Sequence, residues 1–129
     1  MIKAKILNIT TKNGVSLYKF QAAQIYLFML SLDRIDGVFE GRDVMLNFKS
    51  SDVIIATKEL EACSVKNKIP ALVTKISAGE ILSAIHLKFD EFEFESIITA
   101  GSCKDLNLKV GGRVFAYVKS TSLHISEVI

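Results

Sequence analysis

The strongest constraint on the fold is an internal repeat. Residues 37–55 align without a gap with residues 107–125, and the same residue occurs in both copies at five positions. These positions are Gly41/Gly111, Val44/Val114, Lys49/Lys119, Ser50/Ser120 and Ile55/Ile125. A second similarity relates residues 2–9 to residues 69–76. Self-similarity at a fixed spacing is typical of chains built from copies of one supersecondary unit. We therefore expect two successive copies of one small domain.

Each copy has the pattern of short β-strands. Residues 85–89 and 92–95 alternate apolar and polar side chains, and Asp90-Glu91 between them predicts a hairpin turn. Asn13-Gly14 is a strong hairpin-turn dipeptide in the first copy. Residues 114–118 are β-branched, aromatic or alanine, which favours a strand buried on both faces. The chain is therefore predicted to be all-β.

One helical turn is expected in each copy beside these strands. Residues 102–106 favour such a turn, with Asn107 ending it in the left-handed conformation and Gly37 in the same role in the first copy. Five short strands and a helical turn in about 65 residues predict a small closed barrel of the OB type. The predicted fold is two tandem OB-like five-stranded barrels. The expected division is a first repeat at residues 1–57, a linker at 58–65 and a second repeat at 66–129.

Composition excludes several classes of protein. Half of the 129 residues are hydrophobic, which is enough to bury a core. The 16 basic and 14 acidic residues give a formal net charge of +2, too balanced to indicate a nucleic-acid or membrane-surface protein. The apolar run at residues 25–30 is far shorter than the ~20 residues of a membrane-spanning helix. The N-terminal sequence lacks the pattern of a secretion signal, and Cys63 and Cys103 form no CxxC pair, so we expect a cytoplasmic protein.

No catalytic motif is present. The chain lacks a nucleophile-elbow, P-loop, zinc-protease or dinucleotide-binding signature, so no enzyme activity is predicted. Glu91, Glu93 and Glu95 follow strand spacing and are interpreted as a solvated face. His86 and His124 have no carboxylate at ligand spacing and are interpreted as surface or half-buried residues, so no side chain is expected to ligate a metal directly.

Three short segments combine hydroxyl groups, backbone donors and lysine. They are residues 64–67 before the second copy, residues 98–102 where a strand leads into the helical turn, and residues 119–121 at the end of a strand. Hydroxyls, free backbone N–H groups and fixed ammonium groups are the donors that a tetrahedral oxyanion requires.

These segments carry a family resemblance. Ser64-Val65-Lys66-Asn67 resembles the Ser-Ala-Arg-Asn opening of the molbindin family, also called Mop or TOBE domains. Residues 97–102 resemble its Ile-Thr-x-x-Ser stretch, and residues 108–111 with 118–123 resemble its Gly-x-x-Val and Val-Lys-Ser-Thr ending. Residues 48–57 are similar to the last strand of the sensing region of the molybdate-responsive transcription regulator. The resemblance covers essentially the whole chain in the family's two-repeat form.

The resemblance implies a function without catalysis. Members bind molybdate or tungstate between barrels, so the expected role is storage, buffering or sensing of that oxyanion in the cytoplasm by a homo-oligomer, either a trimer or a dimer. The residues carried over to the oxyanion site are Ser64, Lys66, Thr99, Ser102, Lys119 and Ser120, with Lys49 and Ser50 as weaker candidates. The resemblance also implies that Ser64 and Lys66 face Lys119 and Ser120 across an interface between barrels.

The sequence departs from the family pattern in two places. Lys66 replaces an arginine, which exchanges a planar fork of donors for a point charge. In the first copy Met29 and Leu32 are expected where Thr99 and Ser102 occur in the second, which predicts a degenerate first site. The apolar run at residues 25–30 is a candidate surface for assembly.

Two other functions remain open. An OB-fold nucleic-acid-binding module would need exposed aromatic residues interleaved with basic ones. Phe89, Phe92 and Phe94 are flanked by acidic residues instead, which argues against it. The second alternative is a sensing module that acts on a partner regulator or transporter.

Overall fold

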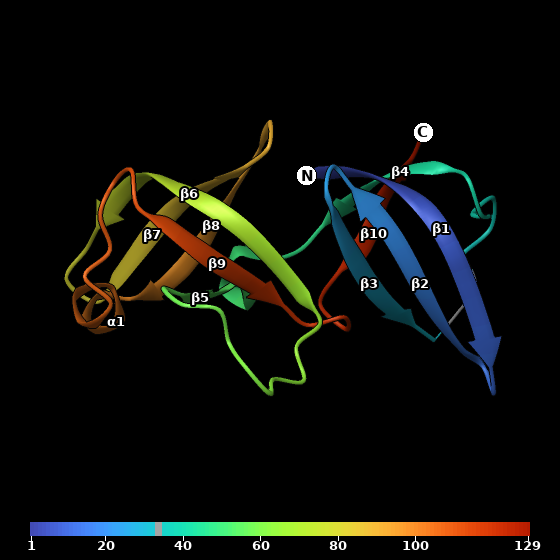
Figure 1. Cartoon of the computed structure of the whole chain (residues 1–129), viewed down its shortest axis with the longest axis horizontal. Coiled ribbons are helices and arrows are strands. Elements are labelled where there is room, and N and C mark those ends of the chain that lie inside the picture. Colours follow the sequence, from blue (N-terminus) through green and yellow to red (C-terminus); the bar gives the residue numbers. More distant parts are fainter. Residues whose placement is uncertain (33–34) are drawn as a thin grey trace.

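The computed structural model describes residues 1–32 and 35–129 and consists of two curled, antiparallel five-stranded sheets that lie side by side (Figure 1). The sheets have the strand orders β10-β4-β1-β2-β3 and β5-β9-β6-β7-β8. The strands are β1 (Ile2–Lys12), β2 (Val15–Ala22), β3 (Ile25–Ser31), β4 (Asp43–Asn47), β5 (Ile54–Ala56), β6 (Asn67–Ala78), β7 (Leu82–Phe89), β8 (Phe92–Thr99), β9 (Arg113–Val118) and β10 (His124–Val128). The helices are the 3₁₀ helix η1 (Ser50–Asp52) and α1 (Ala100–Asp105). The predicted fold, tandem OB-like β units, is confirmed.

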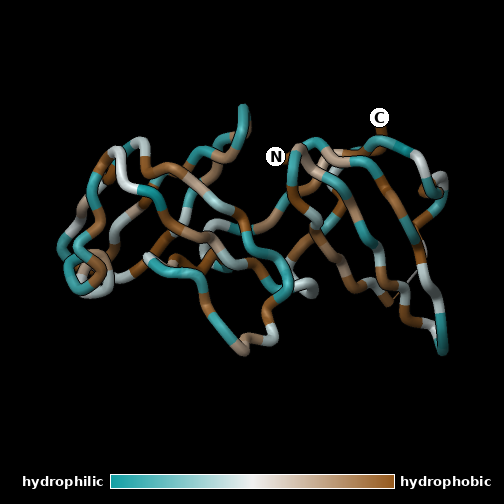
Figure 2. Tube along the Cα trace, viewed as in Figure 1, coloured by the Kyte–Doolittle hydropathy of each residue, from teal (hydrophilic) through white to brown (hydrophobic). Residues whose placement is uncertain are grey.

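Alternating side chains place the core inside each curled sheet. Along β2 every second side chain is buried, beginning with Ser16 and continuing through Tyr18 and Phe20 to Ala22. Figure 2 shows hydrophobic and hydrophilic residues interspersed along the strands. In β9 five of the six residues are buried or half-buried, because it is a central strand whose outer face is also covered. This agrees with the sequence prediction for residues 114–118.

The two halves repeat one another in detail. The β1–β2 pairing has a bulge between Ile6 and Asn8, and the β6–β7 pairing has one between Val73 and Lys75. At each bulge a glycine N–H donates to the carbonyl of the residue where the bulge begins, from Gly41 to Ile6 and from Gly111 to Val73, at 2.7 Å in both cases. Both glycines have φ near +89°, a conformation that side chains with a Cβ rarely adopt. The two halves therefore share the same β-bulge and the same glycine contact to it, as well as the same order of strands.

The halves exchange their final strands. β5 pairs with β9 of the second half, and β10 pairs with β4 of the first half. In Figure 1 the red β10 crosses to the sheet that contains the N-terminus, while β5 lies in the other sheet. Each sheet is therefore completed by a strand from the other half, and the two halves are joined by backbone hydrogen bonds as well as by the connecting segment.

The predicted hairpin turns and the helical turn of the second copy are present. The helical turn expected before Gly37 in the first copy falls on a segment that includes residues 33–34, which lie outside the described residues. Asn13 and Gly14 have φ of 53° and 77° in the β1–β2 turn. The helix α1 begins at Ala100, two residues before the predicted start, because the Thr99 side chain caps it. Asn107 and Gly37 both have positive φ, as predicted for the residues that end these turns.

One predicted correspondence between the halves is wrong. Tyr18 pairs with Met29 in the β2–β3 hairpin, and Ile85 pairs with Ser96 in the β7–β8 hairpin, so Met29 corresponds to Ser96 rather than to Thr99. Leu32 corresponds to Thr99 rather than to Ser102. The spacing of 70 holds only for the later strands, since the hairpins match at a spacing of 67 and the residues of α1 make up the difference.

Within residues 1–32 and 35–129, no helix is long and apolar enough to cross a membrane.

Candidate functional site

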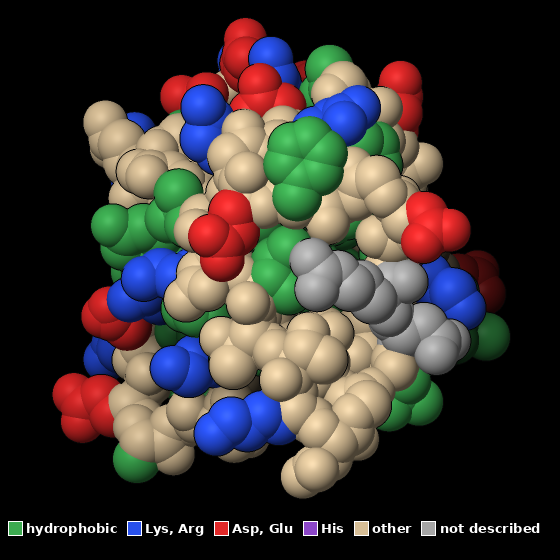
Figure 3. Space-filling view, turned by 90° about the vertical axis from the view of Figure 1, so that its right-hand side faces the viewer, with side chains coloured by type: hydrophobic (Ala, Val, Ile, Leu, Met, Phe, Trp, Pro, Cys, Tyr) green, Lys and Arg blue, Asp and Glu red, His purple; other side chains and the backbone are tan. Residues whose placement is uncertain are grey.

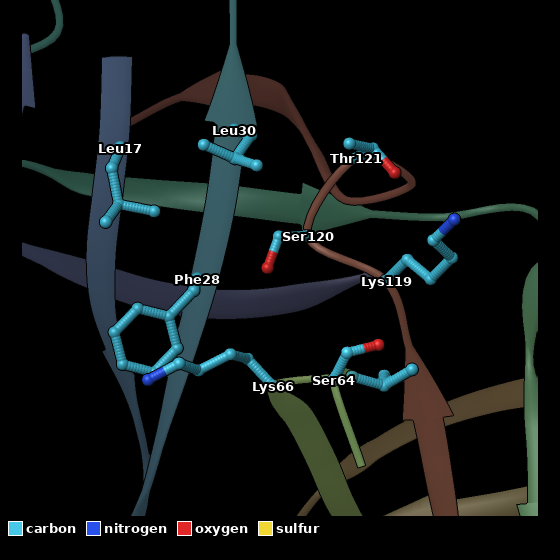
Figure 4. A pocket seen from close by; sticks show the side chains of 9 residues that line it. Leu17, Phe28, Leu30, Ser64, Lys66, Lys119, Ser120 and Thr121 are labelled. Atoms are coloured by element: carbon cyan, nitrogen blue, oxygen red, sulfur yellow. The ribbon is translucent and has the colours of Figure 1, made fainter. Parts of the chain in front are cut away.

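A cavity of about 370 Å³ lies where the two halves meet (Figure 4). Its lining combines three apolar side chains from the first half with lysines and hydroxyl groups from the second. The lining residues are Leu17, Phe28, Leu30, Ser64, Val65, Lys66, Lys119, Ser120 and Thr121. Four of the residues expected in the oxyanion site are among them: Ser64, Lys66, Lys119 and Ser120.

The polar side of the cavity follows from the pairing of β6 with β9. Asn67 at the start of β6 is opposite Val118 at the end of β9, because the strands are antiparallel. Lys66 precedes the first of these residues and Lys119 follows the second, so both lysines leave the same corner of the sheet. The four residues thus lie on one side of the cavity, whereas the resemblance implied that Ser64 and Lys66 face Lys119 and Ser120 across an interface between barrels. Within one chain, the residues before β6 and those after β9 already line the same cavity.

The apolar side comes from the β2–β3 hairpin of the first half. Leu17 and Leu30 are directly opposite each other in the pairing of β2 with β3, and Phe28 is two residues before Leu30 on the same face of β3. β3 is the edge strand of its sheet, so its outer backbone groups need partners outside that sheet. The Leu30 N–H donates to the carbonyl of Ser120 at 3.0 Å. The Asn67 side chain bonds both the N–H and the carbonyl of Phe28.

The described residues that line this cavity include two lysines, Lys66 and Lys119, and no aspartate or glutamate. The Lys66 Nζ lies 5.0 Å from the centroid of the Phe28 ring, within cation–π distance. In Figure 4 the Ser120 hydroxyl points toward the centre of the cavity, whereas the Lys119 side chain extends away from Phe28. Lys119 is exposed and has four rotatable bonds, so its ammonium is free to swing toward a bound anion.

The other two carried-over residues, Thr99 and Ser102, do not line this cavity. The Thr99 hydroxyl accepts from the Ser102 N–H at 3.0 Å and is 2.8 Å from the Ser102 hydroxyl oxygen, which makes Thr99 the N-cap of α1. Ser102 instead lines a separate hollow with Ile54 and Ile98. The weaker candidates Lys49 and Ser50 form the start of η1 and contribute to neither of these cavities.

Sequence reasoning missed the apolar wall of the cavity. Phe28 and Leu30 belong to the apolar run at residues 25–30, which was predicted as a surface for assembly and not as part of the site, and Leu17 was not singled out. Which outer face meets the second half depends on the strand exchange. Thr121 was noted within residues 119–121 but was not placed in the site. Val65 adds an apolar contact that the hydroxyl pattern did not indicate.

A third cavity joins His86 with acidic residues on the outer face of the β7–β8 hairpin. The His86 Nδ1 lies 3.3 Å from a Glu95 carboxylate oxygen, because these residues are opposite each other in the strand pairing. His86 is half-buried and His124 is exposed, as predicted. The strand pairing also gives His86 a carboxylate neighbour that the sequence spacing did not indicate. Glu91, Glu93 and Glu95 are exposed, as predicted. In the described part of the chain, no group of three or more His, Cys, Asp or Glu side chains has the arrangement needed to hold a metal ion.

The aromatic residues weighed for nucleic-acid binding pack against one another. Phe94 makes an edge-to-face contact with Phe48, and Phe92 stacks on the buried Phe89. Acidic and basic side chains are interspersed on the face drawn in Figure 3. Neither observation favours a stacking platform beside a basic groove.

Comparisons with known proteins agree with this architecture. Residues 64–125 match the TOBE domain model. The molybdenum import ATP-binding protein ModC of Brucella abortus (strain 2308) is 36% identical over 107 residues, which are 81% of this chain and 30% of ModC. A molybdate-binding protein from Sporomusa ovata is 33% identical over a region that covers 46% of this chain and 90% of that one, with a TM-score of 0.45. The chain thus spans less than a third of the length of the ModC relatives that it matches.

The structure of the cytoplasmic molybdate-binding protein ModG with molybdate bound has the same overall fold. The TM-score is 0.89 at 18% identity, covering 96% of this chain and 92% of that one. By fold, the protein is therefore a tandem OB-like β protein with exchanged final strands. The chain therefore contains a domain of the TOBE family at residues 64–125, and its similarity to ModC extends over 81% of its length.

Proposed function

We propose that the chain binds a tetrahedral oxyanion, molybdate or tungstate, in the cavity between its halves. The observation that carries the proposal is the cavity's set of donors: two lysines and three hydroxyl-bearing side chains, with no carboxylate among the described lining residues. The family relatives support the choice of anion, since those described above are named for molybdenum import or molybdate binding.

The donor set suits a doubly charged anion. Lys66 and Lys119 supply two positive charges, and Ser64 and Ser120 supply hydroxyl donors. Charge-assisted hydrogen bonds of this kind are about twice as strong as neutral ones. The apolar wall opposite them, to which Leu17 and Leu30 contribute, lowers the local dielectric constant and strengthens each of these bonds.

The proposed role is binding without catalysis, for storage, buffering or sensing in the cytoplasm. We also propose a homo-oligomer, a dimer or a trimer. Thr99 and Ser102 lie outside the cavity of their own chain, so they contribute to an oxyanion site only if a second copy brings them there. Lys49 and Ser50 belong to a weaker second site in which the apolar Leu32 replaces the threonine of the other half.

A sensing module that acts on a transporter is the second candidate. It is favoured by the match of 81% of this chain to part of an import ATP-binding protein. Under this alternative the same cavity binds the same anion, and the outer faces of the sheets contact the partner.

Isothermal titration calorimetry with molybdate, tungstate and sulfate tests the proposal. The three anions carry the same charge, so a difference in affinity reports how well fixed donors fit each size. The shorter S–O bonds leave sulfate unable to reach every donor, and each missed hydrogen bond costs about 1–3 kcal/mol. We expect sulfate to bind at least tenfold more weakly, which corresponds to about 1.4 kcal/mol. Equal affinities for sulfate and molybdate, or no binding of either, contradict the proposal.

Native mass spectrometry of the same samples tests the proposed assembly. It reports the number of chains and the number of bound anions together. A 14.3 kDa monomer with full molybdate occupancy would contradict the homo-oligomer and assign all donors to one chain.

A further inference from the structure

Asn67 makes contacts that the strand ladder does not account for. Its side chain is fully buried, and its Oδ1 accepts the Phe28 N–H at 2.7 Å while its Nδ2 donates to the Phe28 carbonyl at 2.9 Å. One amide group thus satisfies both outer backbone groups of a residue on an edge strand, as a neighbouring strand would. Asn67 belongs to the second half and Phe28 to the first, so this contact fastens the halves to each other.

The same contact determines the surroundings of Lys66. Lys66 is the residue before Asn67, and its ammonium lies 5.0 Å from the centre of the Phe28 ring. The Asn67 hydrogen bonds fix the Phe28 backbone relative to Asn67, the neighbour of Lys66, and so hold together the two residues that make the cation–π contact. A lysine side chain is flexible, and an ammonium kept beside the cavity loses less conformational freedom when an anion binds.

Lys119 is supported by a different contact. The carbonyl of the next residue, Ser120, accepts the Leu30 N–H at 3.0 Å. The residues next to the two lysines, Asn67 and Ser120, are therefore bonded to β3 at two separate points, one at Phe28 and one at Leu30. This separation makes the two supports experimentally distinguishable.

We propose that Asn67 is a positioning residue for the oxyanion site: by holding Phe28 it places the Lys66 ammonium at the cavity, and it does not act on Lys119. The inference rests on the proposed function, because it concerns the affinity of the same cavity for the anion. It adds a residue that touches no ligand but determines the geometry of one that does.

Double-mutant cycles on molybdate affinity test the inference by calorimetry. Lys66→Ala and Asn67→Ala are each expected to weaken molybdate binding about tenfold. If Asn67 acts through Lys66, the double variant loses about tenfold, whereas independent effects would multiply to about a hundredfold. The cycle of Asn67→Ala with Lys119→Ala is the matched control and is expected to be additive. Asn8→Ala, at an exposed asparagine that does not line the cavity, is expected to leave the affinity unchanged.

A second variant keeps the test valid if Asn67→Ala fails to fold. Phe28→Leu removes the ring beneath the Lys66 ammonium but retains the backbone groups that Asn67 bonds. It is expected to be non-additive with Lys66→Ala and additive with Lys119→Ala. Additive behaviour of both Lys66 cycles would overturn the inference while leaving the proposed function in place. Absence of molybdate binding by the unmodified chain would overturn both, so the two failures are distinguishable.

Amide hydrogen exchange gives a readout that needs no anion. In the unmodified chain the Phe28 amide should exchange slowly, because its proton is donated to Asn67. In Asn67→Ala we expect its exchange to accelerate at least tenfold relative to the Leu30 amide, which keeps its bond to Ser120. Equal acceleration of both amides would show a general loosening of the joint and would overturn the specific role of Asn67.

Discussion

Replacing Ser96 with alanine tests how strongly the exchanged segments hold the halves together. Ser96 is fully buried in β8, and its hydroxyl donates to the Val53 carbonyl at 2.7 Å. Val53 lies just before β5, the strand that the first half contributes to the second sheet. The substitution leaves this carbonyl buried without its partner, which costs about 1–3 kcal/mol, whereas the lost side-chain volume is a single oxygen atom.

The matched control is Ser16→Ala. Ser16 is also buried, but its hydroxyl lies 2.8 Å from that of Thr11, in the same hairpin. Thr11 is exposed, so its hydroxyl can bond water instead, and the expected loss is below about 1 kcal/mol. Urea unfolding followed by circular dichroism measures both losses, with an unchanged m-value as evidence that two-state behaviour holds. Equal losses for the two serines would refute the reasoning that the hydroxyl bond between the halves carries the larger share.

Three further predictions concern the site lysines, the Lys68–Glu59 pair and the cap of α1. Lys119→Ala should weaken molybdate binding by about 1.5–3 kcal/mol in calorimetry, whereas Lys49→Ala at the repeat-equivalent position should cost less; equal losses would contradict a weaker first site. The hydrogen bond from Lys68 to Glu59 raises the pKa of Lys68, so the stability that the pair contributes is complete below the ordinary lysine pKa and disappears as the pH rises through the raised one. Glu59→Gln should return the Lys68 pKa toward its ordinary value in an NMR titration, and an unmoved pKa would contradict this cause. Thr99→Ala removes the cap of α1 and should lower the free energy of unfolding by about 1 kcal/mol; an accompanying loss of molybdate affinity would show that a second copy presents Thr99 to the cavity.

Most of the fold could be predicted because local patterns repeat. Asn13-Gly14 and Asp90-Glu91 determine hairpins by turn chemistry alone. The strand exchange could not be predicted. Residues 54–56 have the same apolar pattern whether they complete their own sheet or the other one, since both acceptor strands are copies of the same sequence.

The site was predictable on one side only. Ser64, Lys66, Lys119 and Ser120 stand out as donors at strand ends, and antiparallel pairing brings them together. The apolar wall depends on contacts between residues far apart in the sequence, for which neither periodicity nor motif gives a signal. The mistaken equivalence of Met29 with Thr99 has a similar origin, because the extra residues of α1 change the spacing between the copies without leaving a composition signal.

The asymmetry between the halves explains why the cavity forms at this junction. The outer face of the β2–β3 hairpin carries Leu17, Phe28 and Leu30. In the β7–β8 hairpin Glu95 occupies the position of Phe28, whereas the apolar Ala84 and Ile97 occupy those of Leu17 and Leu30. An anion placed against the second face would meet a carboxylate, and one placed against the first meets only apolar groups and the cations of the other half. The first half therefore contributes the apolar wall of the cavity, and the second half contributes its charged and hydroxyl-bearing side chains. Because the final strands are exchanged, the two halves can separate only if the hydrogen bonds of β5 with β9 and of β10 with β4 both break. These bonds therefore keep the donors of the second half next to the apolar wall of the first.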